Sequence, residues 1–204
     1  MPTYLYLASQ SPRRSQLLEQ IGVRHELLLP NAPGDAAEDS EAMEVQLPGE
    51  APRAYVERVT GLKLDAALAR LARRGLPKAP VLCADTTVAL GRRIYGKPQD
   101  AQDAARMLAQ LAGQTHRVLT FVALQVGSKR LTALSASSVQ FETLTSERIA
   151  AYVATGEPMG KAGAYAVQGR AGAFIALIRG SYSGIMGLPL FETGQLLRAA
   201  GFVV

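Results

Sequence analysis

Apolar residues along the chain follow two patterns, and each pattern predicts a class of secondary structure. Short continuous apolar runs bounded by Gly, Pro or polar residues are typical of strands, whereas apolar residues three or four positions apart are typical of helices. The predicted strands cover residues 4–8, 25–29, 81–90, 116–126 and 130–142, and two more short apolar runs lie at 164–168 and 172–179. The predicted helices cover residues 11–22, 52–74, 100–111, 145–156 and 187–201.

Residues with defined backbone preferences mark the limits of these elements. Serine suits the N-cap, and proline suits the first helical position, so Ser11-Pro12 begins a helix that Gly22 ends. Gly127-Ser128 separates two long apolar runs and predicts a hairpin turn. Because strands and helices do not alternate strictly, the pattern predicts an α/β fold with a mixed, partly antiparallel sheet flanked by helices.

The chain has 204 residues, of which 48% are hydrophobic. This length suits one domain over residues 1–204, or at most two small lobes. Residues 30–50 are rich in Pro, Gly, Ala and acidic residues, and they predict an acidic flexible loop.

The net charge of +5 is unevenly distributed. Residues 35–50 hold six of the 17 acidic residues and no Lys or Arg, which leaves 11 acidic residues against 22 basic ones elsewhere. A basic body suggests an anionic partner, either a phosphorylated small molecule or a nucleic acid. A solvated basic surface is the alternative.

The chain has one cysteine, Cys83, so it cannot form an intrachain disulfide, and this fits a reducing compartment. Its position in an apolar run favours a core residue over a nucleophile. The N-terminus lacks the basic region of a signal peptide, and no apolar stretch approaches the ~18 residues of a membrane span. The two histidines, His25 and His116, have no second His or Cys nearby, which argues against a zinc site.

The start of the first predicted helix carries two adjacent arginines. Arg13 and Arg14 fall in the first helical turn, where positive charge opposes the helix dipole. Free backbone N–H groups, serine hydroxyls and guanidinium groups all suit phosphate oxygens. Residues 9–14 therefore indicate a phosphate site, with a capped helix and two solvated arginines as the alternative. No P-loop motif is present.

Asp85 lies in the middle of the apolar run 81–90. A carboxylate in such a strand is costly unless it is paired or metal-bound, so Asp85 is a candidate for catalysis. A structural Asp bound by backbone N–H groups or by an arginine is the alternative. Lys97, held between Gly96 and Pro98, could reach a phosphate, and an exposed loop lysine is the alternative there.

Small residues dominate 161–169, and they allow a ligand to approach the backbone closely. Gln168 could read the edge of a nucleobase, because an amide both donates and accepts hydrogen bonds. The alternative is a glycine-rich turn before a strand.

Together these motifs resemble those of the Maf family of nucleoside triphosphate pyrophosphatases, in the family's order and over nearly the whole chain. The matching segments are residues 7–14, 84–86, 96–98, 111–116, 161–165 and 187–190. The pattern Ala-Gly-Ala-Tyr-x-x-Gln-Gly at 162–169 looks like the subgroup that acts on dTTP and UTP.

The resemblance implies a Maf/ITPase-like fold, a single catalytic domain that allows two lobes with the active-site cleft between them, and dependence on Mg²⁺ or Mn²⁺. Asp85 falls on the family's catalytic carboxylate, either as general base or as metal ligand. The implied phosphate-binding residues are Ser9, Arg13, Arg14, Lys63, Lys97 and Lys161. The positions where subgroups differ in substrate are Arg13, Thr86 and Gln168.

Two segments depart from the family pattern. The family usually has an acidic motif directly after the second strand. Residues 29–35 do not match this motif, and most acidic residues of this segment come later, so no metal ligand besides Asp85 is assigned. The motif around Lys63 is altered at 58–64.

The resemblance also implies a cytoplasmic homodimer that clears noncanonical nucleotides and is linked to arrest of cell division. We expect a nucleoside triphosphate as partner, no membrane, and no stable nucleic-acid complex. Two other function classes remain. One is a nucleotide- or nucleic-acid-binding regulatory module without hydrolytic activity, although the 6% aromatic content argues against stacking on single strands. The other is a phosphatase that releases orthophosphate.

Overall fold

A seven-stranded sheet organises the chain in a computed structural model that describes residues 3–32, 35, 38 and 40–204. The strand order is β2-β1-β3-β5-β6-β7, and β4 pairs with β3. Pairing is parallel among β2, β1 and β3 and antiparallel from β3 to β7, which confirms the predicted mixed sheet. The strands are β1 (Leu5–Leu7), β2 (His25–Leu27), β3 (Val81–Leu90), β4 (Arg93–Tyr95), β5 (Thr115–Val126), β6 (Lys129–Phe141) and β7 (Ile175–Arg179).

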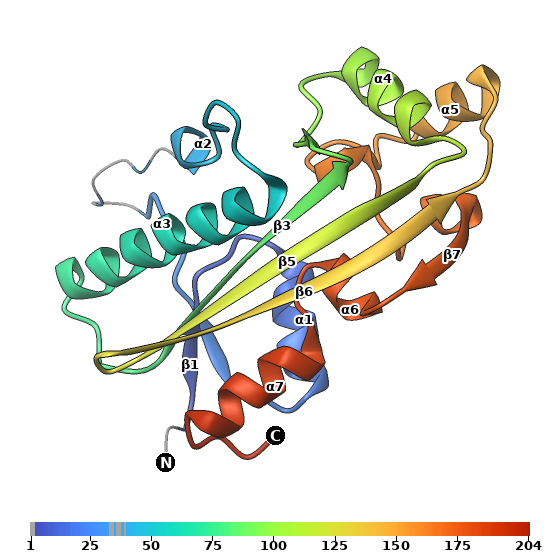
Figure 1. Cartoon of the computed structure of the whole chain (residues 1–204). Helices are drawn as coiled ribbons and strands as arrows, with labels where there is room; N and C mark the ends of the chain where they lie inside the picture. The colour runs from blue at the N-terminus through green and yellow to red at the C-terminus, as the bar shows by residue number, and fades with distance from the viewer. Residues whose placement is uncertain (1–2, 33–34, 36–37, 39) are drawn as a thin grey trace.

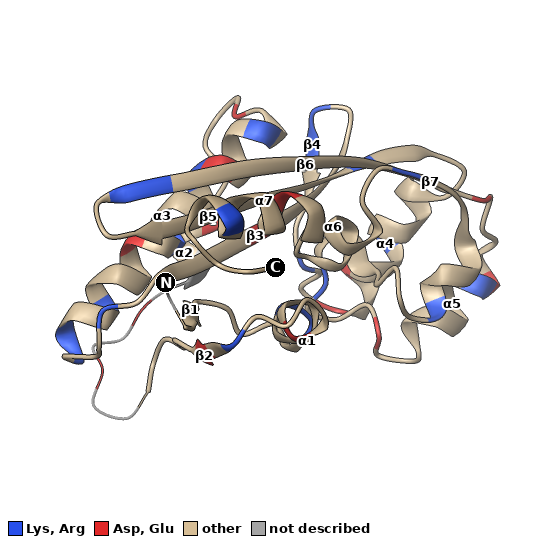
Figure 2. Ribbon diagram, turned by 90° about the horizontal axis from the view of Figure 1, so that it is seen from below, with Lys and Arg blue, Asp and Glu red and all other residues tan. Residues whose placement is uncertain are grey.

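Helices cover both faces of the sheet (Figure 1). Helix α3 packs on one face against β3 and β5, whereas α1, α6 and α7 lie on the other. The long strands β5 and β6 extend across the molecule, with α4 and α5 together at one end (Figure 2). The helices are α1 (Pro12–Gln20), α2 (Ser40–Met43), α3 (Pro52–Arg73), α4 (Ala101–Leu111), α5 (Ser146–Val153), α6 (Tyr182–Met186) and α7 (Leu190–Ala199).

Alternation along β3 distributes its side chains among three buried clusters. Leu82 joins the cluster beneath α1 and α7, and Cys83 joins the cluster beneath α3. Farther along the strand, Val88 belongs to a third cluster, with α4, α5 and Phe141. The long strands therefore contribute to a core at each end, and residues 85–87 of β3 lie between these cores.

Two of the predicted apolar runs form other structures. Residues Ala162–Ala164 form a short 3₁₀ helix, η1, in which Gly163 and Ala164 have φ values of 69° and 60°. This left-handed backbone interrupts the strand that the run 164–168 suggests. A second 3₁₀ helix, η2 (Arg170–Phe174), delays the start of β7 to Ile175. The short elements β4 and α6 have no clear hydrophobic period, and the sequence pattern does not predict them.

The acidic segment 30–50 is attached to α3. Residues Ser40–Met43 form α2, so the predicted loop is wrong at these positions. Three of its described carboxylates pair with arginines of α3 or of its C-cap, which the composition of the segment alone does not indicate. The pairs are Asp35 with Arg74, Glu38 with Arg70 and Arg73, and Glu50 with Arg58.

Arg70 is the most deeply buried of these arginines, with 4% of its surface exposed. It donates to both carboxylate oxygens of Glu38 and to the carbonyl of Leu28. We expect Arg70→Met to lower the free energy of unfolding by about 3 kcal/mol, because it leaves a partly buried carboxylate and a carbonyl without their donor.

Urea unfolding measures this effect, and Arg73→Met is the matched control. Arg73 contacts the same Glu38 at 3.1 Å, but 44% of its side chain is exposed, so its loss should cost less than about 1 kcal/mol. Equal losses of unfolding free energy for the two variants would show that burial of the arginine does not determine its contribution to stability.

In the part of the chain that the structure describes, every helix is too short or too polar to cross a bilayer.

Candidate active site

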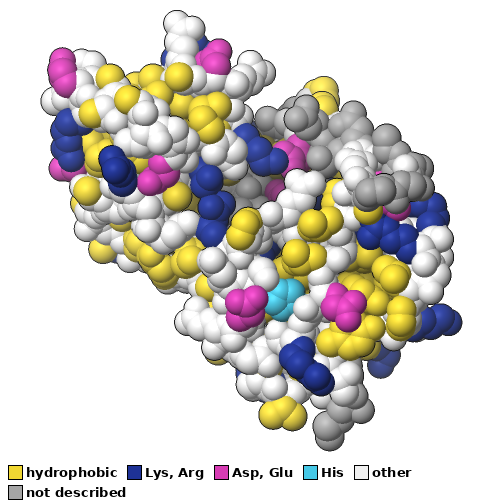
Figure 3. Space-filling model, turned by 180° about the vertical axis from the view of Figure 1, so that it is seen from behind, with side chains coloured by type: hydrophobic (Ala, Val, Ile, Leu, Met, Phe, Trp, Pro, Cys, Tyr) yellow, Lys and Arg dark blue, Asp and Glu magenta, His cyan; other side chains and the backbone are white. Residues whose placement is uncertain are grey.

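A cavity of about 430 Å³ lies between the cores at the two ends of the sheet. Figure 3 shows the molecule hollowed there, with Lys and Arg side chains along the hollow. Every site residue predicted from the sequence lines this one cavity, although their chemical roles stay predictions. They are Ser9, Arg13, Arg14, Lys63, Asp85, Thr86, Lys97, Lys161 and Gln168.

The cavity opens at a break in the pairing of β3. Strand β1 pairs with β3 only at Val81 and Leu82, and β4 pairs with it only from Val88 onward. Between these contacts β3 has β5 along one edge and, among the described residues, no strand along the other. Asp85 and Thr86 occupy this break, which explains why a strand at the centre of the sheet reaches the cavity.

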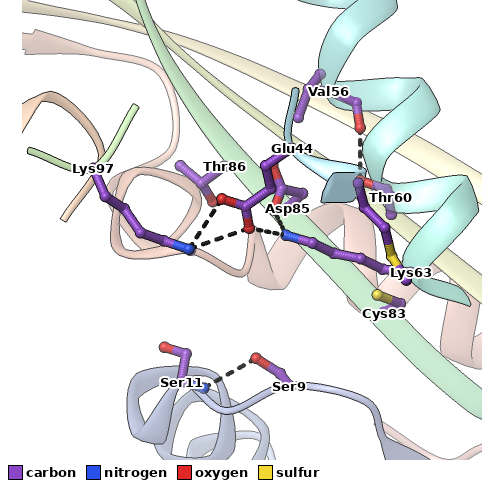
Figure 4. Close-up of polar contacts among 12 residues, drawn as sticks. Ser9, Ser11, Glu44, Val56, Thr60, Lys63, Cys83, Asp85, Thr86 and Lys97 are labelled. Atoms are coloured by element: carbon purple, nitrogen blue, oxygen red, sulfur yellow. Dashed lines mark hydrogen bonds and ion pairs between the residues drawn. The ribbon is translucent and has the colours of Figure 1, made fainter. Parts of the chain in front are cut away.

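Asp85 belongs to a chain of ion pairs across the cavity wall (Figure 4). The ammonium of Lys63 lies 2.6 Å from Asp85 Oδ1 and 2.6 Å from Glu44 Oε1. Lys97 Nζ lies 3.1 and 3.0 Å from the two oxygens of Glu44. Only 13% of the Asp85 side chain is exposed, so the pair with Lys63 is largely removed from water.

The pKa shifts of Lys63 and Glu44 keep both groups charged. Burial lowers the pKa of Lys63, but the Asp85 and Glu44 carboxylates outweigh burial and raise it overall. Burial likewise raises the pKa of Glu44, and Lys63 and Lys97 outweigh that effect and lower it. Lys63 therefore stays protonated and Glu44 ionised near neutral pH.

The sequence did not identify Glu44, which is one of six acidic residues in its segment. Its position depends on α3, because the Tyr55 hydroxyl donates to the carbonyl of Glu44 at 2.8 Å. Arg58 donates to the carbonyls of Met43 and Val45 on either side, at 3.4 and 2.9 Å. These contacts are distant in sequence, so no local signal marks Glu44.

The opposite wall of the cavity is cationic. Arg14 donates to Ser9 Oγ at 3.0 Å and to the carbonyl of Gly187 at 2.8 Å, which fixes the guanidinium group. Neither Arg13 nor Arg14 nor Lys161 forms an ion pair with a carboxylate of the described residues. Burial and the neighbouring Arg14 lower the pKa of Arg13, and burial and then Arg13 lower the pKa of Lys161. Three cations without anions are thus held around one space, as an anion-binding site requires.

The start of α1 adds backbone donors to this wall. Pro12 occupies the first turn as predicted, and Ser11 is the N-cap residue, but its side chain makes no capping hydrogen bond. The N-terminal N–H groups of α1 are therefore not occupied by that hydroxyl, and residues 11–14 line the cavity.

Two parts of the cavity suit other contacts. Val88, Val118 and Ile185 supply apolar side chains to the lining, and Gln168, which is exposed, supplies a polar one. Cys83 lies behind Asp85 in the core, and burial raises the pKa of its thiol to about 11, so it stays an unreactive core residue.

The carboxylates of Glu44 and Asp85 also fit a divalent cation. Glu44 Oε1 and Asp85 Oδ1 each lie 2.6 Å from Lys63 Nζ, so the distance between these two oxygens cannot exceed the sum of the two contacts. Mg²⁺ prefers oxygen ligands and is commonly held by one or two carboxylates together with substrate phosphates. This donor set has that composition.

Comparison with known proteins agrees with the resemblance. The family model described as Maf-like protein matches residues 4–200. A dTTP/UTP pyrophosphatase of Albidiferax ferrireducens is 67% identical over 204 residues, which is all of both chains. Proteins of the same name are 63% identical in a Polaromonas species, over 98% of both chains, and 61% identical in Burkholderia pseudomallei, over 97% of this chain and 93% of the relative. The chain therefore belongs to the Maf family.

Proposed function

We propose that this protein hydrolyses dTTP and UTP to the nucleoside monophosphate and pyrophosphate. One observation carries the proposal: a shielded carboxylate and a wall of cations that pair with no described carboxylate face the same cavity. The relatives named dTTP/UTP pyrophosphatase support the substrate class.

The cationic wall would bind the triphosphate. Arg13 and Lys161 repel each other in the free protein, and phosphate oxygens would replace that repulsion with charge-assisted hydrogen bonds. Arg14 is already fixed by Ser9 and Gly187, so binding would cost little side-chain entropy. Lys97 would reach the same phosphates from the opposite side.

Asp85 would take the proton from a water that attacks the α-phosphorus. The new bond joins the water oxygen to phosphorus, the bond to the bridging oxygen of the β-phosphate breaks, and pyrophosphate leaves with that electron pair. Lys63 would hold Asp85 in place through its 2.6 Å contact. Positioning and charge neutralisation supply most of the catalysis in such a displacement.

Glu44 and Asp85 would hold Mg²⁺ or Mn²⁺ beside the phosphates. When bound, a divalent cation neutralises the charge that develops on the leaving pyrophosphate. Asp85 would then serve both as a ligand and as the proton acceptor. Lys63 would keep its contacts to both carboxylates from the α3 side.

Glu44→Gln tests the metal role. We expect the Mg²⁺ concentration for half-maximal activity to rise at least about 10-fold, because one of two charged ligands is lost. A metal titration at saturating UTP measures it, with Glu57→Gln, on the exposed face of α3, as the matched control. An unchanged metal requirement would remove Glu44 from the metal site.

A panel of canonical nucleoside triphosphates tests the function itself. The protein is incubated with dTTP, UTP, CTP, dATP and GTP in Mg²⁺ or Mn²⁺, and pyrophosphate and orthophosphate are measured separately. We expect pyrophosphate, fastest from dTTP and UTP. Orthophosphate would instead indicate a phosphatase, and no release with salt-sensitive binding of nucleic acid would indicate a binding module.

The cytoplasmic location and the homodimer also belong to the proposal. Phe191 is 70% and Tyr182 49% exposed, and these two aromatic side chains are candidates for the dimer contact. Light scattering during size-exclusion chromatography tests the dimer, and a monomer at micromolar concentration would contradict it.

A further inference from the structure

Two threonines on neighbouring strands form a hydrogen-bonded chain beneath the cavity. Thr86 on β3 pairs directly with Thr120 on β5, and their Oγ1 atoms lie 2.9 Å apart. Thr120 Oγ1 also donates to the carbonyl of Gly184, at 2.7 Å. Thr120 is 1% exposed and makes these contacts away from water, whereas Thr86 lines the cavity.

The direction of this chain follows from the carbonyl at its end. A carbonyl oxygen can only accept a hydrogen bond, and a hydroxyl has a single hydrogen, so Thr120 donates its hydrogen to the carbonyl of Gly184. Thr120 must then accept from Thr86. The reverse direction would set the lone pairs of Thr120 and of the Gly184 carbonyl against each other at 2.7 Å, with no hydrogen between them.

This direction decides what Thr86 offers a ligand. Its hydrogen points to Thr120, so Thr86 Oγ1 presents only lone pairs to the cavity and can only accept. Uracil and thymine carry an N–H donor at N3, whereas N3 of cytosine is itself an acceptor. Two acceptors that face each other in a site partly removed from water are unfavourable.

We propose that Thr120 is a positioning residue that fixes the Thr86 hydroxyl as a hydrogen-bond acceptor, and that this acceptor selects pyrimidines with an N3–H over cytosine. The inference rests on the proposed function, since it assigns the source of base selectivity within the same site. Thr86 contacts the base, and Thr120 acts only through Thr86.

Thr120→Val removes the acceptor for the Thr86 hydrogen and keeps the branched shape that suits a strand. The carbonyl of Gly184 retains a donor, because Gly187 N also bonds to it, at 3.0 Å. In this variant the Thr86 hydroxyl can rotate and donate to N3 of cytosine. We expect the ratio of kcat/KM for UTP to that for CTP to fall about 10-fold, mainly through a lower KM for CTP.

Thr120→Ser is the matched control, because it restores a hydroxyl that can both accept from Thr86 and donate to Gly184. Its UTP to CTP ratio should stay within about 2-fold of the wild type. If Thr120→Val lowered kcat/KM for UTP and for CTP by the same factor, so that their ratio stayed unchanged, the inference would be overturned and Thr120 would have a merely structural role.

A comparison of substrates on the wild-type protein tests the same acceptor without any variant. UTP methylated at N3 has no donor there, and UTP methylated at C5 carries the same added bulk and keeps the donor. We expect kcat/KM to fall at least about 10-fold for the first and to stay close to UTP for the second. Equal rates for the two analogues would overturn the inference, whereas a wild-type protein that releases no pyrophosphate from UTP would overturn the proposed function itself.

Discussion

Asp85→Asn is expected to lower kcat for UTP hydrolysis at least about 100-fold while the protein stays folded. Asn has the shape of Asp but cannot accept the proton of the attacking water, and it is a weaker metal ligand. The fold should survive because Lys63 keeps its second carboxylate partner, Glu44, at 2.6 Å. Steady-state release of pyrophosphate and circular dichroism measure the two effects.

Asp65→Asn is the control for this change. Asp65 also pairs with a cation, Arg130, at 2.6 Å, but 59% of its side chain is exposed and it lies outside the cavity lining. The control should keep nearly normal turnover. A folded Asp85→Asn protein that did the same would remove Asp85 from the chemistry.

Arg13→Gln should lower kcat/KM for UTP about 100-fold without reducing thermal stability. The guanidinium is desolvated beside Arg14 and forms no ion pair with the described carboxylates, so in the free protein it only adds repulsion. Its loss should remove a phosphate contact without breaking an ion pair to any carboxylate that the structure describes. This separation of activity from stability identifies a residue placed for a ligand.

Arg53→Gln is the corresponding control, since Arg53 is 72% exposed and, among the described residues, forms an ion pair only with Glu57 on its own helix. It should alter neither kcat/KM nor the melting temperature by a measurable amount. If Arg13→Gln lowered the melting temperature and left kcat/KM unchanged, Arg13 would be a structural residue.

Local patterns in the sequence predict the sheet class and much of the site. A carboxylate inside an apolar strand is costly wherever the strand lies, so the sequence alone makes Asp85 a candidate catalytic residue. The proline at the start of α1 and the arginines that follow it likewise indicate a helix start and a phosphate site from a few adjacent residues. These features depend on one element each.

Features that depend on distant contacts could not be predicted in this way. Glu44 reaches the cavity because Tyr55 and Arg58 hold the backbone at residues 43–45, through contacts between residues 11 to 15 positions apart. The break beside Asp85 arises because β1 is short and β4 begins late, which neither strand shows alone. Thr120 has the sequence context of an ordinary strand residue, and only the cross-strand register places it beneath Thr86.

Hydrolysis of UTP in water enriched in oxygen-18 tests most directly whether the cavity places the α-phosphorus beside Asp85. The label follows the phosphorus that water attacks, and mass spectrometry of both products locates it. Attack beside Asp85 predicts one labelled oxygen in UMP and none in pyrophosphate. Label in pyrophosphate, or labelled orthophosphate, would place the attack at another phosphorus and contradict the arrangement of cations and carboxylate described above.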